Sequence, residues 1–247
     1  MIRTRWFLSL LLVAFLQSAN AQSTNSTSKT PQPGSAIIPV PRDDKSKARF
    51  DLLTERVKAN RGALDILFVG DSITQGWDGA GSNAWRNAYS KYKALNIGIG
   101  GDRTQHVLWR LDNGHAEGLS PKVTVLMIGT NNSGENRNTP EEIVEGVTAV
   151  VAKLREKFPQ TKVLLLGIFP RGERFNTQRG QILQVNQALQ HLADNRNVYW
   201  LDIGYIFIQP DGTISKEIMP DYLHLSPRAY QMWAEAMQLK LDDLLGR

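Results

Sequence analysis

Short apolar runs that stop at glycine constrain the fold of this chain more than any other feature of its sequence. The first run, residues 64–69, ends at Gly70 and is followed by Asp71 and Ser72. Similar runs, each short enough for a buried parallel strand, lie at residues 94–97, 123–128, 163–168 and 198–201. Helical patterns alternate with them, and parallel neighbours need such crossover connections. We therefore expect one α/β domain, a three-layer α/β/α sandwich around a parallel sheet of about five strands.

The helical patterns carry recognisable start signals. Thr139 is a good cap residue, Pro140 suits the first helical position, and Glu142 is placed to close a capping box. Thr104 is expected to cap another helix. Further helices are expected over residues 43–60, 85–92, 178–193 and 226–245.

Three of the apolar runs lead into the same kind of segment, glycine followed by polar residues. These segments are residues 70–72, 100–102 and 129–131. Glycine permits sharp turns and close approach of the backbone to a ligand. Ligands of open α/β sheets bind at the carboxyl ends of the strands. We therefore expect the three segments to form one site.

The residues needed for acyl transfer are available at these positions. Ser72 supplies a hydroxyl nucleophile, and His224 follows Asp221 at a spacing that allows the carboxylate to orient the imidazole. An isolated pair of this kind is more often a turn, but the three strand ends favour the catalytic interpretation. The oxyanion donors would be the backbone N–H groups of Ser72 and Gly101 and the side-chain amide of Asn131.

Other functional classes lack their motifs. No dinucleotide fingerprint, P-loop, clustered metal ligands or G-x-S-x-G elbow is present. The formal net charge is +5, without a basic block or stripe, so we do not expect nucleic-acid binding. Cysteine is absent, which excludes disulfides.

The first 41 residues differ in composition from the rest. Arg3 and Arg5, an apolar core over residues 7–16 and Ala19-Asn20-Ala21 are typical of a secretory signal peptide, which we place at residues 1–21. An uncleaved anchor is the alternative. The core is too short to span a membrane, so no stable insertion is expected after cleavage. Residues 22–41 are predicted to be a disordered polar linker and residues 42–247 the hydrolase domain, which would make the protein secreted or periplasmic.

Four motifs resemble the blocks of the SGNH (GDSL-type) hydrolase family. They are VGDSITQG at Ser72, NIGIGGD at Gly101, GTNN at Asn131 and DYLH at Asp221 and His224. The segments GIGGDRTQHVLWRL, PRGE and DYLHL are similar to the catalytic alpha subunits of platelet-activating factor acetylhydrolase Ib.

The resemblance implies a flavodoxin-like sheet, with Ser72 as nucleophile, His224 as base and Asp221 as its orienting partner. Gly101 and Asn131 would be oxyanion donors. It also implies that no metal or cofactor is needed and that homodimers form. Those relatives are cytosolic, whereas the N-terminus here is typical of export, so the resemblance does not settle the substrate.

Short loops between the motifs leave no lid to shelter a long acyl chain, so we expect short, mainly acetyl, esters. The first hypothesis is an exported serine esterase that deacetylates carbohydrates through an acyl-enzyme. The alternatives are a phospholipid or lysophospholipid esterase and, from another class, a non-catalytic glycan-binding module. Trp77 and Trp109 either stack on a sugar or belong to the core.

Overall fold

A five-stranded parallel sheet forms the centre of the molecule. The structure, a computed structural model, describes residues 35–247. The strands are β1 (Gly62–Gly70), β2 (Ala94–Asn96), β3 (Leu119–Met127), β4 (Lys162–Leu166) and β5 (Val198–Leu201). Their order in the sheet is β2-β1-β3-β4-β5, and every neighbouring pair is parallel. This confirms the predicted sheet and gives it the flavodoxin-like order.

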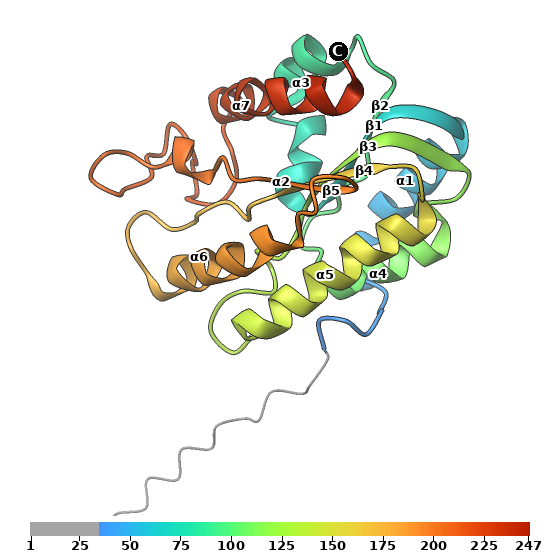
Figure 1. Ribbon diagram of the computed structural model, residues 1–247. Coiled ribbons are helices and arrows are strands. Elements are labelled where there is room, and N and C mark those ends of the chain that lie inside the picture. Colours follow the sequence, from blue (N-terminus) through green and yellow to red (C-terminus); the bar gives the residue numbers. More distant parts are fainter. Residues whose placement is uncertain (1–34) are drawn as a thin grey trace, which may run out of the picture. The chain divides into compact units, whose positions relative to one another are not determined.

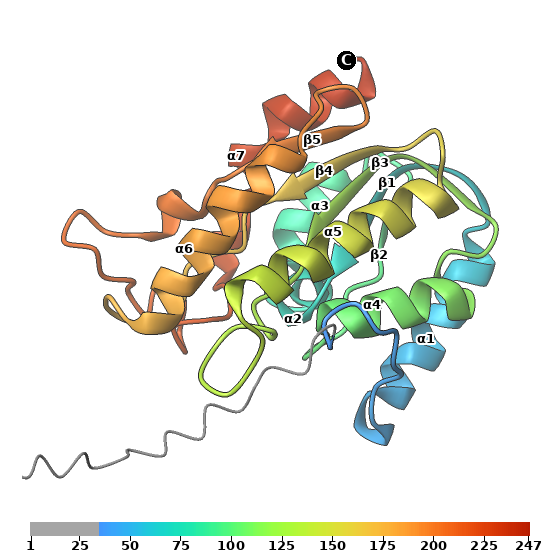
Figure 2. The ribbon, with the colours of Figure 1, turned by 60° about the horizontal axis from the view of Figure 1, so that its bottom comes forward.

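Helices cover both faces of the sheet (Figures 1 and 2). They are α1 (Lys47–Ala59), α2 (Ser72–Gln75), α3 (Ser82–Tyr89), α4 (Thr104–Arg110), α5 (Pro140–Lys157), α6 (Thr177–Leu189) and α7 (Pro227–Leu245). Short helical turns lie at η1 (Asp44–Ser46), η2 (Gly76–Asp78), η3 (Leu111–His115), η4 (Gln190–Leu192) and η5 (Gly204–Phe207). Residues of α1, α4, α5 and α6 pack on one face, and residues of α2, α3 and α7 pack on the other. The predicted three-layer sandwich is therefore confirmed.

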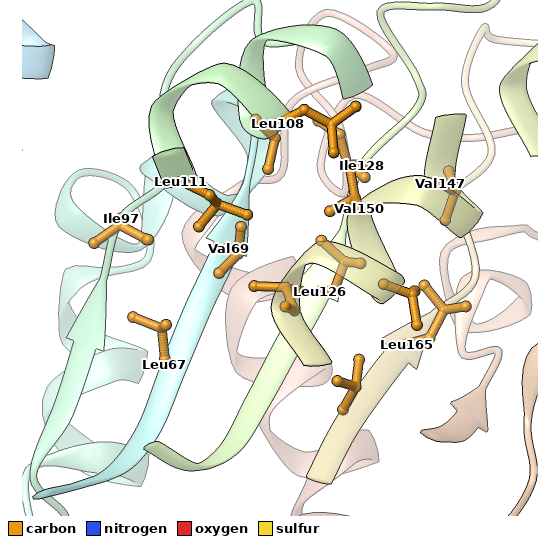
Figure 3. Close-up of a cluster of buried hydrophobic side chains, with 14 of the residues drawn as sticks. Leu67, Val69, Ile97, Leu108, Leu111, Leu126, Ile128, Val147, Val150 and Leu165 are labelled. Atoms are coloured by element: carbon orange, nitrogen blue, oxygen red, sulfur yellow. The ribbon is translucent and has the colours of Figure 1, made fainter. Parts of the chain in front are cut away.

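Strand β1 contributes to both halves of the core. Leu67 and Val69 face the layer of α4 and α5, as Figure 3 shows, whereas Ile66 and Phe68 face α3 and α7. Because helices cover both faces, nearly every residue of the second half of β1 is buried. The apolar run of the sequence is the direct result of this double burial.

The start of α5 follows the predicted capping box. The backbone N–H of Glu142 donates to Thr139 Oγ1 at 3.3 Å, and the N–H of Thr139 donates to Glu142 Oε2 at 3.0 Å. The prediction for α4 is wrong in one detail, because Arg103 rather than Thr104 occupies the cap position. The hydroxyl of Thr104 instead donates to the carbonyl oxygen of Ala36 at 2.7 Å.

Two residues of the predicted linker contact the domain. Ala36 is buried, and the N–H of Val40 donates to the carbonyl of Gln105 at 3.3 Å, whereas residues 37–41 are otherwise exposed. The predicted signal peptide at residues 1–21 and the remaining linker at 22–34 lie outside the described residues. From residue 35 onward, no helix combines the length and apolar character needed to cross a membrane.

Candidate active site

The carboxyl ends of β1 and β3 lie side by side, since Gly70 is the register partner of Met127. A Cβ on Gly70 would lie 2.4 Å from the carbonyl oxygen of Met127, so only glycine fits where β1 turns. The loop after β2 passes over the same point: a Cβ on Gly100 would lie 3.7 Å from that of Ser72. The three predicted segments thus meet at one edge of the sheet.

Asp71 fixes the turn that presents Ser72. Its Oδ1 accepts a hydrogen bond from the backbone N–H of Ile73 at 3.0 Å, which caps the four-residue helix α2. Burial raises the pKa of Asp71 to about 7. The side chain of Asp71 is buried, whereas Ser72 is partly exposed. Asp71 therefore stabilises the turn and Ser72 is the residue that a substrate can reach.

Ser72, His224 and Asp221 form a chain of hydrogen bonds. His224 Nε2 lies 2.9 Å from Ser72 Oγ, and His224 Nδ1 lies 2.6 Å from Asp221 Oδ2. Asp221 Oδ1 also accepts from the backbone N–H groups of Leu223 and His224 at 3.1 and 2.7 Å.

These contacts determine the protonation pattern. Desolvation raises the pKa of Asp221, but the hydrogen bonds from His224 and Leu223 outweigh it and hold the pKa below its usual value. An ionised carboxylate only accepts hydrogen bonds, so His224 Nδ1 must carry a proton. In the neutral imidazole, Nε2 is then left to accept the proton of the Ser72 hydroxyl.

The predicted oxyanion donors lie on the two neighbouring loops. Asn131 Nδ2 donates to the carbonyl oxygen of Asp102 at 2.9 Å, which leaves one amide hydrogen for another acceptor. Gly101 has a φ of 76°, a conformation that favours glycine. The N–H of Gly100 donates to Gln75 Oε1 at 2.7 Å and ties this loop to α2. The sequence-predicted donors are therefore gathered around the turn of Ser72.

A buried ion pair lies beneath the site. Arg110 Nε donates to Asp102 Oδ2 at 2.8 Å, and its Nη2 donates to the carbonyl oxygen of Gly70 at 3.1 Å. Both side chains are at most 2% exposed. Burial raises the pKa of Asp102 to about 6, although Arg110 opposes the shift. Arg110 thus joins the turn of Ser72 to the loop of Gly101.

Arg110 was not predicted from the sequence. The available signal was its position in the helical pattern, because Arg110 follows Val107 by three residues and shares the apolar face with it. A charged residue on a buried face needs a buried partner.

Arg171, on the loop after β4, was missed as well. Its Nη1 donates to Thr130 Oγ1 at 3.2 Å, next to Asn131. The N–H of Gly172 donates to the carbonyl of Tyr222 at 2.8 Å, which fixes the loop to the segment of Asp221 and His224. Among the residues described, no three His, Cys, Asp or Glu side chains form a group suited to a metal ion.

A parallel α/β fold with a Ser–His–Asp hydrogen-bond chain at the carboxyl edge of its sheet is the arrangement expected of a hydrolase of the acyl-transfer class. The model of the GDSL-like Lipase/Acylhydrolase family matches residues 68–232. The chain belongs to this family, and it is a carboxylic ester hydrolase.

The chain is similar to curated proteins over most of its length. It is 41% identical over 218 residues to human platelet-activating factor acetylhydrolase IB subunit alpha1, covering 87% of this chain and 92% of that protein. It is 46% identical over 182 residues to the rat subunit alpha2, which covers 73% of this chain and 77% of that protein.

Solved structures share the fold. A protein from Streptococcus pneumonia, described as a platelet activating factor, superimposes with a TM-score of 0.68 at 26% identity, over 79% of this chain and 92% of that one. A carbohydrate acetylesterase from Sinorhizobium meliloti gives a TM-score of 0.55 at 20% identity, over 73% of this chain and 99% of that one.

The predicted localisation is wrong. The expectation of a secreted or periplasmic protein rested on the N-terminal composition alone, and the curated relatives are subunits of a cytoplasmic enzyme. The positive start, the short apolar core and Ala19-Asn20-Ala21 are a signal from a short terminal segment, and it carries less weight than identities of 41% and 46% over 87% and 73% of the chain. The predicted homodimer and the division at residues 21 and 41 stay predictions.

Proposed function

We propose that the chain hydrolyses short-chain, mainly acetyl, carboxylic esters by covalent catalysis at Ser72. The single observation that carries this proposal is the hydrogen-bond chain from Ser72 Oγ through His224 to Asp221, with distances of 2.9 and 2.6 Å. A hydroxyl becomes an effective nucleophile when a base lies within hydrogen-bond reach and a third group orients that base.

In the first half of the reaction, Ser72 Oγ attacks the carbonyl carbon of the ester while its proton moves to His224 Nε2. Asp221 stabilises the imidazolium that forms. His224 then gives this proton to the alcohol oxygen as the bond between that oxygen and the carbonyl carbon breaks. The alcohol leaves, and the acyl group remains on Ser72.

In the second half, water attacks the acyl carbon and gives a proton to His224. The bond to Ser72 Oγ breaks, the carboxylic acid leaves, and Ser72 recovers its proton from His224. In both halves the carbonyl oxygen becomes negative and accepts hydrogen bonds from the N–H groups of Ser72 and Gly101 and from the amide of Asn131. Loss of one such donor costs on the order of 10²- to 10³-fold in turnover.

For the alcohol part of the ester, we place phospholipid-like esters ahead of acetylated carbohydrates. The relatives at 41% and 46% identity are named acetylhydrolases of platelet-activating factor, whereas the carbohydrate acetylesterase shares the fold alone at 20% identity. Trp77 is only 1% exposed and packs on Trp233, so it is not free to stack on a sugar. Trp109 packs on Phe50.

The test is hydrolysis of 4-nitrophenyl esters of increasing acyl length by the purified chain. We expect the highest kcat/KM for acetate, a loss on the order of 10³-fold or more in Ser72→Ala, and normal activity in Ser90→Ala, which removes an exposed hydroxyl. A preference for C8 or longer esters would refute the short-acyl claim. Full activity in Ser72→Ala would refute the nucleophile. A wild type inert toward every ester that still binds a glycan would favour the non-catalytic module.

A further inference from the structure

A polar cavity of about 280 Å³ adjoins the candidate active site. It is lined by residues of the loop between 130 and 137 and by Arg171 and Gln178. Asn131, the proposed oxyanion donor, belongs to its lining. A group bound in this cavity would therefore lie beside an ester whose carbonyl is held by Asn131.

Two arginines give the cavity its character. Arg171 Nη1 donates to Thr130 Oγ1 at 3.2 Å, and Arg137 Nη1 donates to the carbonyl oxygen of Asn131 at 3.4 Å. Over residues 35–247, no carboxylate comes within 4.0 Å of either guanidinium group. Each guanidinium has five N–H donors, so several donors on each remain for a ligand. Glu135, the one acidic residue of the lining, is exposed.

The two cations are close enough to affect each other. Burial and the charge of Arg137 lower the pKa of Arg171, while Asp71 and Asp221 raise it. Asp71 and Asp221 belong to the candidate active site, so Arg171 lies between that site and the cavity. An anion in the cavity would remove the repulsion between the two guanidinium groups.

The backbone that carries Arg171 is held in place from two sides. Arg179 Nε donates to the carbonyl oxygen of Arg171 at 3.2 Å, and its Nη2 donates to that of Gly172. The N–H of Gly172 donates to the carbonyl of Tyr222. Arg179 is itself buried. A guanidinium that is already positioned loses little conformational freedom on binding.

We propose that this cavity binds an anionic group, a phosphate or carboxylate, on the alcohol part of the ester. This inference rests on the proposed hydrolysis at Ser72 and adds the place where an anionic group would bind, with Arg171 and Arg137 as the residues that select it. Guanidinium groups match phosphate and carboxylate oxygens through paired hydrogen bonds. The anion can come from a lipid headgroup or from a soluble phosphorylated alcohol, and the two sources share this chemistry.

The first experiment compares two pairs of acetyl esters. One pair is 1-alkyl-2-acetylglycerol with and without a 3-phosphate, and the other is an acetylated methyl glucoside with and without a 6-phosphate. We expect a higher kcat/KM for the phosphorylated member of at least one pair, and the pair that responds identifies the source. Equal kcat/KM within both pairs would overturn the inference.

Three variants connect such a preference to the cavity. Arg171→Gln and Arg137→Gln should each lower the ratio of phosphorylated to neutral kcat/KM on the order of tenfold. Glu135→Gln removes a negative charge that would repel the bound phosphate, so it should raise the ratio of phosphorylated to neutral kcat/KM. Arg174→Gln removes an exposed arginine of the same loop that does not line the cavity, and it should leave the ratio unchanged. Arg137 is exposed, so its variant tests the inference even if Arg171→Gln does not fold.

A binding measurement separates this inference from the proposed function. Titration calorimetry with glycerol 3-phosphate should detect binding to wild type and to Ser72→Ala. The binding should weaken on the order of tenfold in Arg137→Gln and as the salt concentration rises. If neutral esters are hydrolysed through Ser72 without any phosphate preference or phosphate binding, the function stands and the inference fails. If phosphate binds through Arg137 but no ester is hydrolysed, the anion site stands and the function fails.

Discussion

Replacing Arg110 by methionine should destabilise the protein by about 3–5 kcal/mol, the usual cost of breaking a buried ion pair from one side. Arg110 and Asp102 are only 2% and 0% exposed. Methionine fills much of the space of the arginine stem, but above pH 6 Asp102 must either keep a buried charge without a cation or take up a proton. The carbonyl oxygen of Gly70 also loses its donor.

The destabilisation by Arg110→Met should increase with pH. The pKa of Asp102 in the fold, about 6, is raised above its unfolded value of 3.8, so its contribution to stability is full below pH 4 and is lost as pH rises through 6. Without Arg110 the pKa of Asp102 in the fold rises further, so the variant continues to lose stability as the pH rises above 6. The destabilisation by Arg110→Met should therefore be small near pH 4 and largest above pH 6.

The assay is urea unfolding followed by the fluorescence of the six tryptophans. The double variant Arg110→Met with Asp102→Leu should recover most of the loss, because no buried charge remains. Arg61→Met is the matched control: the Arg61–Glu117 pair is exposed, and its loss should cost less than about 1 kcal/mol. A loss below about 1 kcal/mol for Arg110→Met, or the same loss at pH 4 and pH 8, would refute this reasoning.

Three further substitutions test single contacts. Asp71→Asn keeps the cap of α2 but cannot ionise. The pKa of Asp71 is about 7 in the fold and 3.8 in the unfolded chain, so between pH 4 and pH 8 wild type should lose up to about 4 kcal/mol of stability relative to this variant. Urea unfolding that shows the same stability difference between the two proteins across that range would contradict this. Thr139→Ala should cost about 1 kcal/mol through loss of the cap, and thermal unfolding at an unchanged midpoint would count against the capping box. Gly70→Ala should destabilise by about 1–3 kcal/mol or more, because its Cβ would meet the carbonyl of Met127, and it should depress ester hydrolysis; near-normal stability in urea would show that β1 can shift.

The elements that sequence analysis found are those whose cause is local. The apolar run at 198–201 is strand β5 (Val198–Leu201), and the signals at Thr139, Pro140 and Glu142 begin α5. Strand burial and helix capping depend on neighbours a few residues away, so they leave a pattern in the chain. Helix α2 was missed because four residues are too few to show a period.

The motifs also indicated which residues belong to one site. Glycine followed by polar residues after successive strands placed Ser72, Gly101 and Asn131 at one edge of the sheet. Asp221 and His224 joined them through their spacing and the family resemblance. The sequence alone thus predicted the residues of the hydrogen-bond chain and the proposed oxyanion donors, but not Arg110 or Arg171.

Only the tertiary structure decided how these residues meet. Ser72 and His224 are 152 residues apart, and their 2.9 Å contact depends on how α7 and the loop before it pack on α3 and on the face of the sheet that carries Phe68. The partners of Arg110 lie 8 and 40 residues away, and Ala36 contacts Thr104 across 68 residues. A single sequence can mark a residue such as Arg110 as needing a partner, but it does not identify that partner, because contacts across tens of residues leave no short-range pattern. The sequence by itself determined the elements and the chemistry of the site, and the packing of distant segments determined the geometry that allows this chemistry.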